Sequence, residues 1–425
     1  MKKHLIAAAV AAAVAAPAMA QSTVEVYGIL STAYSATDAK LSVDGVSSTV
    51  KSTNSGQQGA QAGNRLGFRG TEDLGGGMKA GFVYELGANL ETGLAANRLG
   101  YAQLQGGFGT VRAGRVDSLT RSVYNSFTAF GNSGFAPGNF GASLPQLVAP
   151  AIVEGAFQNT RNGTAISVGR ALDRGCGAYG YSIGAEANAS VAAGFNSDVA
   201  TASANCTALA DAFGYGATRV NGSIGYISPS FSGVTVQAQF GKLERDSDAN
   251  ASTNDQTSMN FGINYAAGPL ALAVALDTVD TKANERNGAA ATAPALITTL
   301  LNRTNELQAD TTMFAGSYDF GVAKVFGLIV EKELKFTDGD DSLKIRENTI
   351  GVQVPVGALQ LVGSYSDGSV KAADRKDDLS GYQLQANYRL SKRTHLFAMY
   401  GETEWKGDGL KSEIDGFALG VQHSF

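Results

Sequence analysis

The sequence contains few of the residues that build metal centres, disulfide scaffolds or membrane-spanning helices. Its 425 residues include two cysteines, three histidines and one tryptophan. A structural zinc site needs four ligands, usually cysteine or histidine, so Cys176, Cys206 and the two downstream histidines, His395 and His423, do not favour one. Beyond residue 20 no apolar run approaches the ~20 residues of a membrane-spanning helix. The chain is therefore either water-soluble or crosses a membrane as strands.

The N-terminus has the features of a secretory signal peptide. Lys2 and Lys3 precede an apolar run that ends in Ala18-Met19-Ala20, a small-x-small cleavage pattern, so we predict removal of residues 1–20 and a mature chain 21–425. Loss of the two lysines lowers the basic count from 33 to 31 against 38 acidic residues, and the net charge falls from −5 to −7. Nucleic acid is not an expected partner. A cysteine pair in an exported protein is usually oxidised, which predicts a Cys176–Cys206 disulfide closing a local loop.

Alternating apolar and polar residues predict an all-β fold. The last stretch, 415–425, alternates up to Phe425, with Phe417, Leu419 and Val421 on one face. An apolar strand left at the edge of a sheet invites aggregation, and closure of the sheet into a barrel removes the edge. We therefore predict that this strand closes a barrel against the first strand, Thr23–Ser31.

The spacing of turns predicts how the barrel is connected. Tight turns near residues 75, 107, 229, 268, 320, 357 and 392 alternate with longer polar segments, one of which follows Ser31 and ends at Asn64. About sixteen strands result, the even number expected of an outer-membrane barrel with apolar residues outside and a polar lumen inside. Six tyrosines near strand ends favour this barrel over a soluble sandwich, although tyrosine is also an ordinary strand former: Tyr84, Tyr226, Tyr265, Tyr365, Tyr388 and Tyr400.

The alternation fails from Asp117 to Thr218, about a hundred residues, so this segment is predicted to be functional or specially folded. Residues 165–168 and 179–183 are candidates for an accessory hairpin. Counting residues 160–190 as a transmembrane hairpin would give eighteen strands and a substrate-selective channel, but their alternation is poor. Gly180-Tyr181-Ser182-Ile183-Gly184 fits the nucleophile elbow of hydrolases, yet neither strand nor helix flanks it. We therefore predict neither an enzyme nor a cofactor.

Four blocks of the sequence resemble the general porins of Gram-negative bacteria of the Neisseria, Bordetella and Burkholderia type. They are N-R-L-G-F-R-G-T-E-D-L-G-G-G-M-K-A, F-G-T-V-R-A-G-R, R-V-N-G-S-I-G-Y-I-S-P-S-F-S-G, and the ending from Y-R-L-S-K-R-T-H-L-F-A-M-Y to V-Q-H-S-F. The resemblance runs from about residue 22 to 425 and is weak across 118–218. It implies a homotrimer of sixteen-stranded barrels in the outer membrane, each with its third outer loop, here about residues 118–218, folded toward the pore. It also implies that Phe425 belongs to the signal for the barrel-assembly machinery.

The resemblance further places Arg65, Arg98 and Arg219 on the wall at the pore constriction. Strand parity independently puts these three on the polar face, together with Arg69, Arg112 and Arg389, while Leu99 and Tyr101 are predicted to face the opposite, apolar side. Arg115 has the wrong parity unless a bulge intervenes. Arginine-lined pores favour anions. The alternative is that each arginine only pairs with a lumenal acid such as Glu25, Glu72 or Glu85.

The elongated loop also departs from the family pattern in its charge. Between Ser118 and Gln158 the only charged residues are Arg121 and Glu154, so the loop lacks the family's acidic stretch. We therefore predict passive diffusion of small hydrophilic solutes and ions through a water-filled pore that prefers anions or selects weakly. The alternative function is a barrel anchored in outer-membrane lipid whose long loop serves as an adhesin or receptor element.

Overall fold

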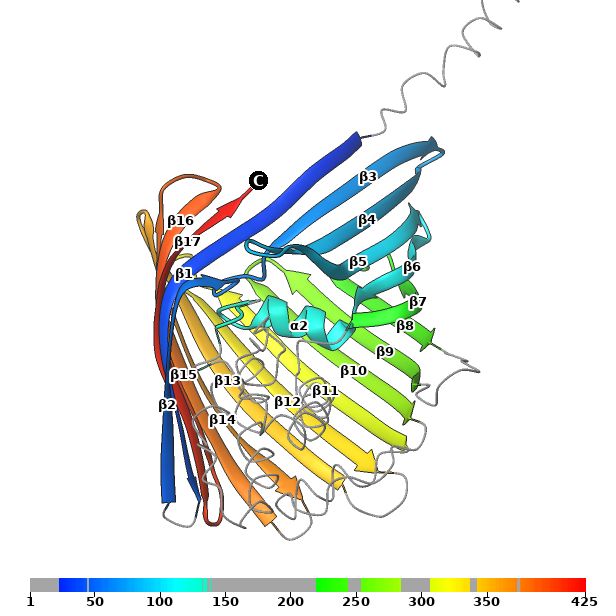
Figure 1. The fold of residues 1–425 in the computed structure, drawn as a ribbon. Helices are drawn as coiled ribbons and strands as arrows, with labels where there is room; N and C mark the ends of the chain where they lie inside the picture. The colour runs from blue at the N-terminus through cyan, green and yellow to red at the C-terminus, as the bar shows by residue number, and fades with distance from the viewer. Residues whose placement is uncertain are drawn as a thin grey trace, which may run out of the picture.

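The computed structural model forms a closed antiparallel β-barrel with a short helix inside it (Figure 1). It describes residues 23–43, 46–131, 133–135, 138, 219–243, 254–283, 306–336, 342–372 and 375–425. The elements are β1 (Thr23–Val43), β2 (Val46–Gln58), β3 (Arg65–Gly75), β4 (Met78–Asn89), β5 (Gly93–Gly106), β6 (Gly109–Asp117), α2 (Leu119–Phe127), β7 (Arg219–Ile227), β8 (Val234–Leu243), β9 (Asn254–Ala267), β10 (Leu270–Ala283), β11 (Glu306–Asp319), β12 (Lys324–Phe336), β13 (Ser342–Val356), β14 (Leu359–Ala372), β15 (Arg375–Arg389), β16 (Thr394–Lys406) and β17 (Leu410–Ser424).

The barrel closes where β17 pairs with β1, as the sequence predicted. Ser424 lies opposite Ile29 and Leu410 opposite Val43. β2 pairs with the later part of β1 and β3 with its first part, so these two strands share one position in the ring. The seventeen described strands therefore occupy sixteen positions. β6 pairs directly with β7, which leaves no place between them for a transmembrane hairpin from residues 160–190, and the eighteen-strand alternative is wrong.

Two predictions about the strands near the N-terminus are corrected. The first strand extends to Val43 and is followed by β2, whereas the sequence predicted a polar loop from Ser31 to Asn64. The segment is rich in serine, threonine and glycine, so it shows no apolar alternation, but its backbone pairs with β1 along most of its length. The predicted tight turns are all present. The two candidate hairpin pieces, 165–168 and 179–183, and the motif at Gly180 lie outside the described residues.

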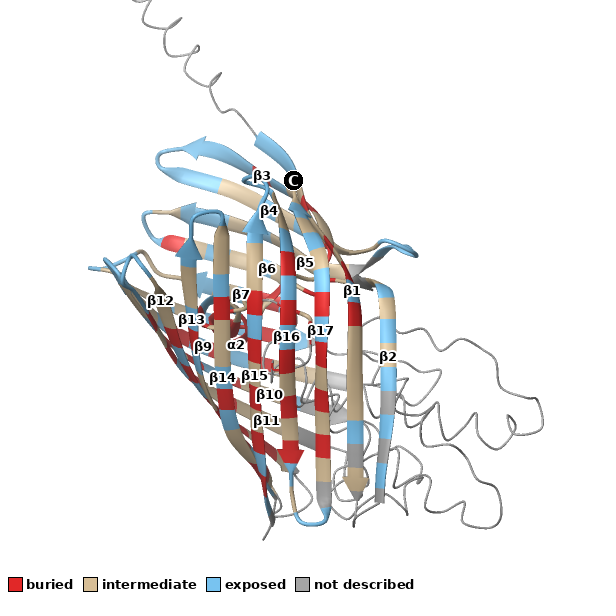
Figure 2. Ribbon diagram, turned by 90° about the vertical axis from the view of Figure 1, so that its left-hand side faces the viewer, coloured by how far each residue is buried: buried red, intermediate tan, exposed pale blue. Residues whose placement is uncertain are grey.

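The outer wall near the short turns is apolar. Buried and exposed residues alternate along the strands (Figure 2). Seven outward side chains from different strands are 42 to 64% exposed: Phe82, Ile224, Phe261, Leu272, Ile350, Leu384 and Leu419. Five of the six predicted girdle tyrosines are also exposed on this wall, at 40 to 51%: Tyr84, Tyr226, Tyr365, Tyr388 and Tyr400. Lipid is the solvent that such a wall fits.

The wall reverses its polarity toward the long loops. On β12 the outward side chains change from Ile329 to Glu331, Glu333 and Lys335, whereas Leu334 faces inward and is 1% exposed. Charged outward residues continue on the neighbouring strands and form ion pairs, which we call the outer charged belt: Glu331, Glu333, Lys335, Lys344, Arg346, Lys376, Asp378, Glu404, Lys411 and Glu413. The expectation that the inner face is polar along every strand is therefore wrong in this part of the barrel.

Phe425 completes the barrel seam. Its backbone N–H donates to Gly28 O at 3.1 Å, and its carbonyl accepts from Gly28 N at 3.0 Å. A Cβ on residue 28 would lie 2.4 Å from the Phe425 ring, so only glycine fits opposite this side chain. Among the described helical residues, none belongs to a helix long and apolar enough to cross a membrane.

Candidate functional site

Helix α2 lies inside the ring of strands, midway along the barrel (Figure 1). Ser118 caps its N-terminus by accepting a hydrogen bond from Arg121 N at 3.1 Å. Leu119, Val123 and Phe127 recur at the spacing of one helical face and pack against inward residues of β10–β12, among them Met313. Because α2 occupies part of the lumen, it narrows the barrel at this level.

Two sets of polar contacts fix α2 and the chain that follows it. At the helix N-terminus, Thr120 Oγ1 donates to the buried Asp277 carboxylate of β10, and Leu119 N donates to Asn260 Oδ1 of β9 at 3.3 Å. Beyond the helix, Ala129 O accepts from Gln353 on β13, and Phe135 N donates to Ala60 O. The described part of the long loop 118–218 therefore follows the inner wall from β9 to β13 and then runs toward the β17–β1 seam.

Arg65 and Arg98 share the Glu85 carboxylate. Arg98 Nε lies 2.7 Å and Arg65 Nη1 3.9 Å from Glu85 Oε1, and Tyr27 OH donates to Oε2 at 3.1 Å. A register shift in the β4–β5 ladder at Glu85 and Leu86 turns Arg98 into the lumen. The shift also corrects the predicted faces of β5, because Tyr101 points inward, where Arg112 lies 5.3 Å above its ring, while Ala102 faces outward with Phe82.

Arg121 and Arg219 share the Asp117 carboxylate beside this first group. Arg121 Nε of α2 lies 2.9 Å and Arg219 Nε of β7 lies 3.2 Å from Asp117 Oδ1. Arg115 occupies a bulge in the β6–β7 ladder and donates to Asn221, so the bulge that its parity required is present. Arg219 lies within electrostatic range of Arg98, Arg115 and Arg121.

We call Arg65, Arg98, Arg115, Arg121 and Arg219 the arginine cluster. Four of these guanidinium groups pair with two carboxylates, Glu85 and Asp117, and Arg115 joins them through a hydrogen bond to Arg98 O at 3.3 Å. The formal charge of these described groups is +3. The three arginines that the sequence placed together, Arg65, Arg98 and Arg219, are thus brought together by β3, β5 and β7. Among the described residues, no group of three or more His, Cys, Asp or Glu is placed to hold a metal ion.

The other predicted site residues lie elsewhere. Arg69 forms an exposed ion pair with Glu25, with Nε 2.8 Å from Oε2. For this arginine the alternative holds, in which the side chain only pairs with a nearby acid. Arg112 Nε donates to Gln103 at 3.2 Å. Cys176 and Cys206 lie outside the described residues, so their disulfide stays a prediction.

The sequence missed two members of the arginine cluster. Arg121 is the only basic residue between Ser118 and Gln158, but its sequence surroundings were not predicted to form a helix. Residues 118–127 carry a usable signal, since Ser118 precedes apolar residues at positions 119, 123 and 127. Arg115 reaches the cluster only through the bulge, which strand parity does not reveal.

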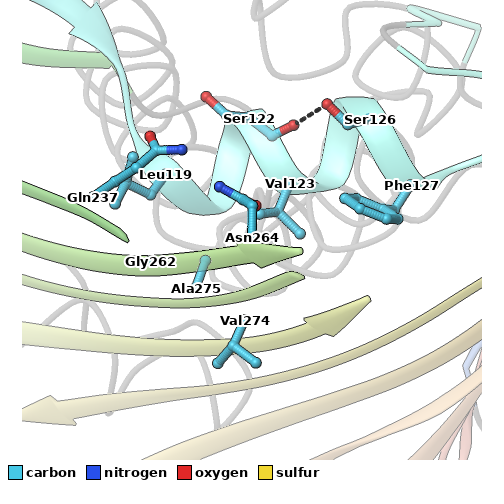
Figure 3. Close-up of a pocket in the computed structure, with 10 residues that line it drawn as sticks. All are labelled: Leu119, Ser122, Val123, Ser126, Phe127, Gln237, Gly262, Asn264, Val274 and Ala275. Atoms are coloured by element: carbon cyan, nitrogen blue, oxygen red, sulfur yellow. Dashed lines mark hydrogen bonds between the residues drawn. The ribbon is translucent and has the colours of Figure 1, made fainter. Parts of the chain in front are cut away.

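A cavity of about 210 Å³ lies between α2 and the wall of β8–β10 (Figure 3). Ser122 and Ser126 line it from the helix, and Gln237 and Asn264 project toward it from the strands (Figure 3). None of its lining residues is ionisable, so this side of the helix offers neutral polar groups, whereas the arginine cluster offers positive charge.

Comparison with known proteins agrees with this architecture. The Gram-negative porin family model matches residues 7–408. Outer membrane porin protein 32 of Delftia acidovorans is 30% identical over 99% of this chain and 93% of its own, and an outer membrane porin of Bordetella pertussis is 25% identical over the whole of both chains. A solved structure, the anion-selective porin from Comamonas acidovorans, covers 95% of this chain and 100% of its own with a TM-score of 0.61 at 23% identity. A closed sixteen-position barrel, an apolar outer wall and these matches together show that the chain belongs to the Gram-negative porin family and is an outer-membrane channel protein.

Proposed function

We propose that small hydrophilic solutes and ions cross this porin by passive diffusion and that anions are preferred. The observation that carries the proposal is the arginine cluster, in which four arginines pair with two carboxylates and a fifth, Arg115, lies beside them at the level of α2. Rings of arginine or lysine at a constriction favour anions. The chain's own net charge, −5 including the leader, does not decide selectivity, because the ions sense mainly the charges at the narrowest level.

Among the described residues, pairing does not cancel the positive charge of the cluster. Arg69 and Glu25 neutralise each other one to one. Glu85, by contrast, pairs with two arginines, and Asp117 pairs with two others, so each carboxylate faces two positive charges. The cluster side chains are also reachable from the lumen, since Arg65 and Arg98 are each 17% and Arg219 is 15% exposed. A small anion can therefore approach them while a cation is repelled.

Three further features belong to the proposal. Residues 118–218 act as the constriction insert, supported by the position of α2 in the lumen. The protein assembles as a homotrimer, which the family resemblance supports. The barrel-assembly machinery recognises the C-terminal strand and Phe425, supported by the place of that residue at the seam. No cofactor takes part.

Planar-bilayer recording tests the channel itself. Purified protein should give stepwise conductance increases, and if insertion occurs as trimers, triplets of equal substeps. Absence of steps from protein whose barrel is intact by its heat-dependent gel shift would defeat the proposal. The sign of the reversal potential in a salt gradient then separates anion from cation preference.

A further inference from the structure

The neutral cavity between α2 and β8–β10 lies on a different side of the helix from the arginine cluster (Figure 3). Consecutive residues of an α-helix are about 100° apart, so Leu119, Val123 and Ser126 of the cavity lining share one face. Arg121 lies about 200° around the helix from Leu119 and pairs with Asp117 instead. The body of the helix therefore separates the cavity from the guanidinium groups.

The cavity has an open polar side and a closed apolar side. Ser122 and Ser126 of its lining are exposed. Val123 and Ala275, which also line it, are 6% and 0% exposed. A solute in the lumen can therefore enter past the two serines and come to rest against apolar side chains.

Two amide side chains project toward this space, and within the described part of the chain neither has a hydrogen-bond partner. Gln237 of β8 and Asn264 of β9 face the helix from the inner wall, each partly exposed (Figure 3). An amide offers two N–H donors and one carbonyl acceptor. The Ser122 and Ser126 hydroxyls already donate to Ser118 O and Ser122 O, at 3.0 and 2.7 Å, so their oxygens can only accept. The cavity thus presents hydrogen-bond donors and acceptors side by side, without charge.

This combination fits a small neutral polyol. Hydroxyl groups both donate and accept, so one molecule can pair with the amides and the serine oxygens while its C–H groups contact Val123 and Phe127. An apolar protein cavity of about 150 Å³ holds one benzene ring. The 210 Å³ here therefore suits glycerol or a single sugar ring rather than a longer chain. We propose that this cavity binds small neutral polyols, including single-ring sugars, as they cross the porin.

The inference rests on the proposed function, because the cavity meets solutes only if they enter the lumen. Uptake of radiolabelled D-glucose into proteoliposomes tests it. Simple diffusion rises linearly with concentration, whereas binding in the cavity should make uptake saturate in the millimolar range. Linear uptake through protein that conducts ions would overturn this inference and leave the proposed function intact. Protein that conducts no ions would defeat the proposed function, and this inference with it.

Variants of similar side-chain volume tie the effect to the cavity. Gln237→Met combined with Asn264→Leu removes both amides and should raise the half-saturating glucose concentration severalfold. Gln239→Met is the matched control, because Gln239 lies on the same face of β8 but outside the cavity lining, and it should leave saturation unchanged. Parental saturation in the double variant would overturn the proposal.

A binding measurement on the parent protein keeps the test decisive if the double variant fails to fold. Saturation-transfer NMR of D-glucose with the detergent-solubilised protein should show transfer to the ring protons of the sugar, and excess glycerol should suppress it. Absence of transfer, or transfer that glycerol does not reduce, would refute binding of polyols in the cavity.

Discussion

Replacing Asp277 by alanine tests how α2 is held against the barrel wall. The Asp277 side chain is 5% exposed and accepts a hydrogen bond from Thr120 Oγ1, which is itself buried at the first turn of the helix. Alanine removes this acceptor and leaves the threonine hydroxyl without it. Asp277→Asn is the matched control, because its amide oxygen still accepts the bond.

The size of the effect follows from the burial of both partners. A hydrogen bond to a charged group contributes about 1.5–3 kcal/mol. Loss of that contribution shifts the balance between docked and displaced helix by about 10- to 150-fold, since ~1.4 kcal/mol is tenfold. The strand ladders of β9 and β10 do not involve the carboxylate, so the barrel itself should stay intact.

Single-channel recording is the assay. Asp277→Ala should raise open-channel noise and add visits to a level of higher conductance, while Asp277→Asn should behave nearly as the parent protein. The heat-dependent gel shift verifies that both variants keep their barrels. An alanine variant with parental noise and conductance would refute the anchoring role of Asp277, as would an asparagine variant as noisy as alanine.

Three further outcomes are expected. Gly28→Leu places a side chain where Phe425 lies, since even a Cβ there is 2.4 Å from the ring, and should lower the yield of folded barrel; parental yield would count against the seam contact. Deleting Phe425 should reduce insertion into the outer membrane while the barrels that do insert keep their conductance, and a normal yield of trimer would contradict its role as an assembly signal. Cys176 and Cys206 should be alkylated only after reduction, and labelling without a reductant would exclude the disulfide.

Much of the barrel follows from sequence because a lipid-facing wall imposes a two-residue period. Strands such as β15, with Tyr382, Leu384 and Tyr388 outside and Gln383 and Gln385 inside, show this period plainly. β2 was missed because serine, threonine and glycine give no apolar signal, although main-chain pairing holds the strand. The buried apolar side chains on the inner face near the long loops, such as Leu334 and Ile345, were also missed. Near the loops, apolar and charged residues still alternate along a strand such as β12. This alternation alone does not tell whether the apolar face points outward to lipid or inward to the lumen.

The candidate site was predicted in part. Arg65, Arg98 and Arg219 are brought together, but Arg98 faces the lumen through a register shift that sequence does not reveal. Arg121 reaches the cluster on a helix of nine residues, a length at which tertiary packing rather than propensity decides whether a helix forms. Glu85, named only as one candidate partner, holds two of the arginines.

The reversal potential in a chloride salt gradient tests the central claim most directly. At ~0.1 M salt the screening length is ~10 Å, so the arginine cluster should still act on passing ions. The parent protein should be anion-preferring, and neutralising Arg65, Arg98 and Arg219 together with glutamine should abolish or reverse the preference. Arg69→Gln, outside the cluster, should change it little. Cation preference in the parent protein, or an anion preference that survives the triple substitution, would contradict the account.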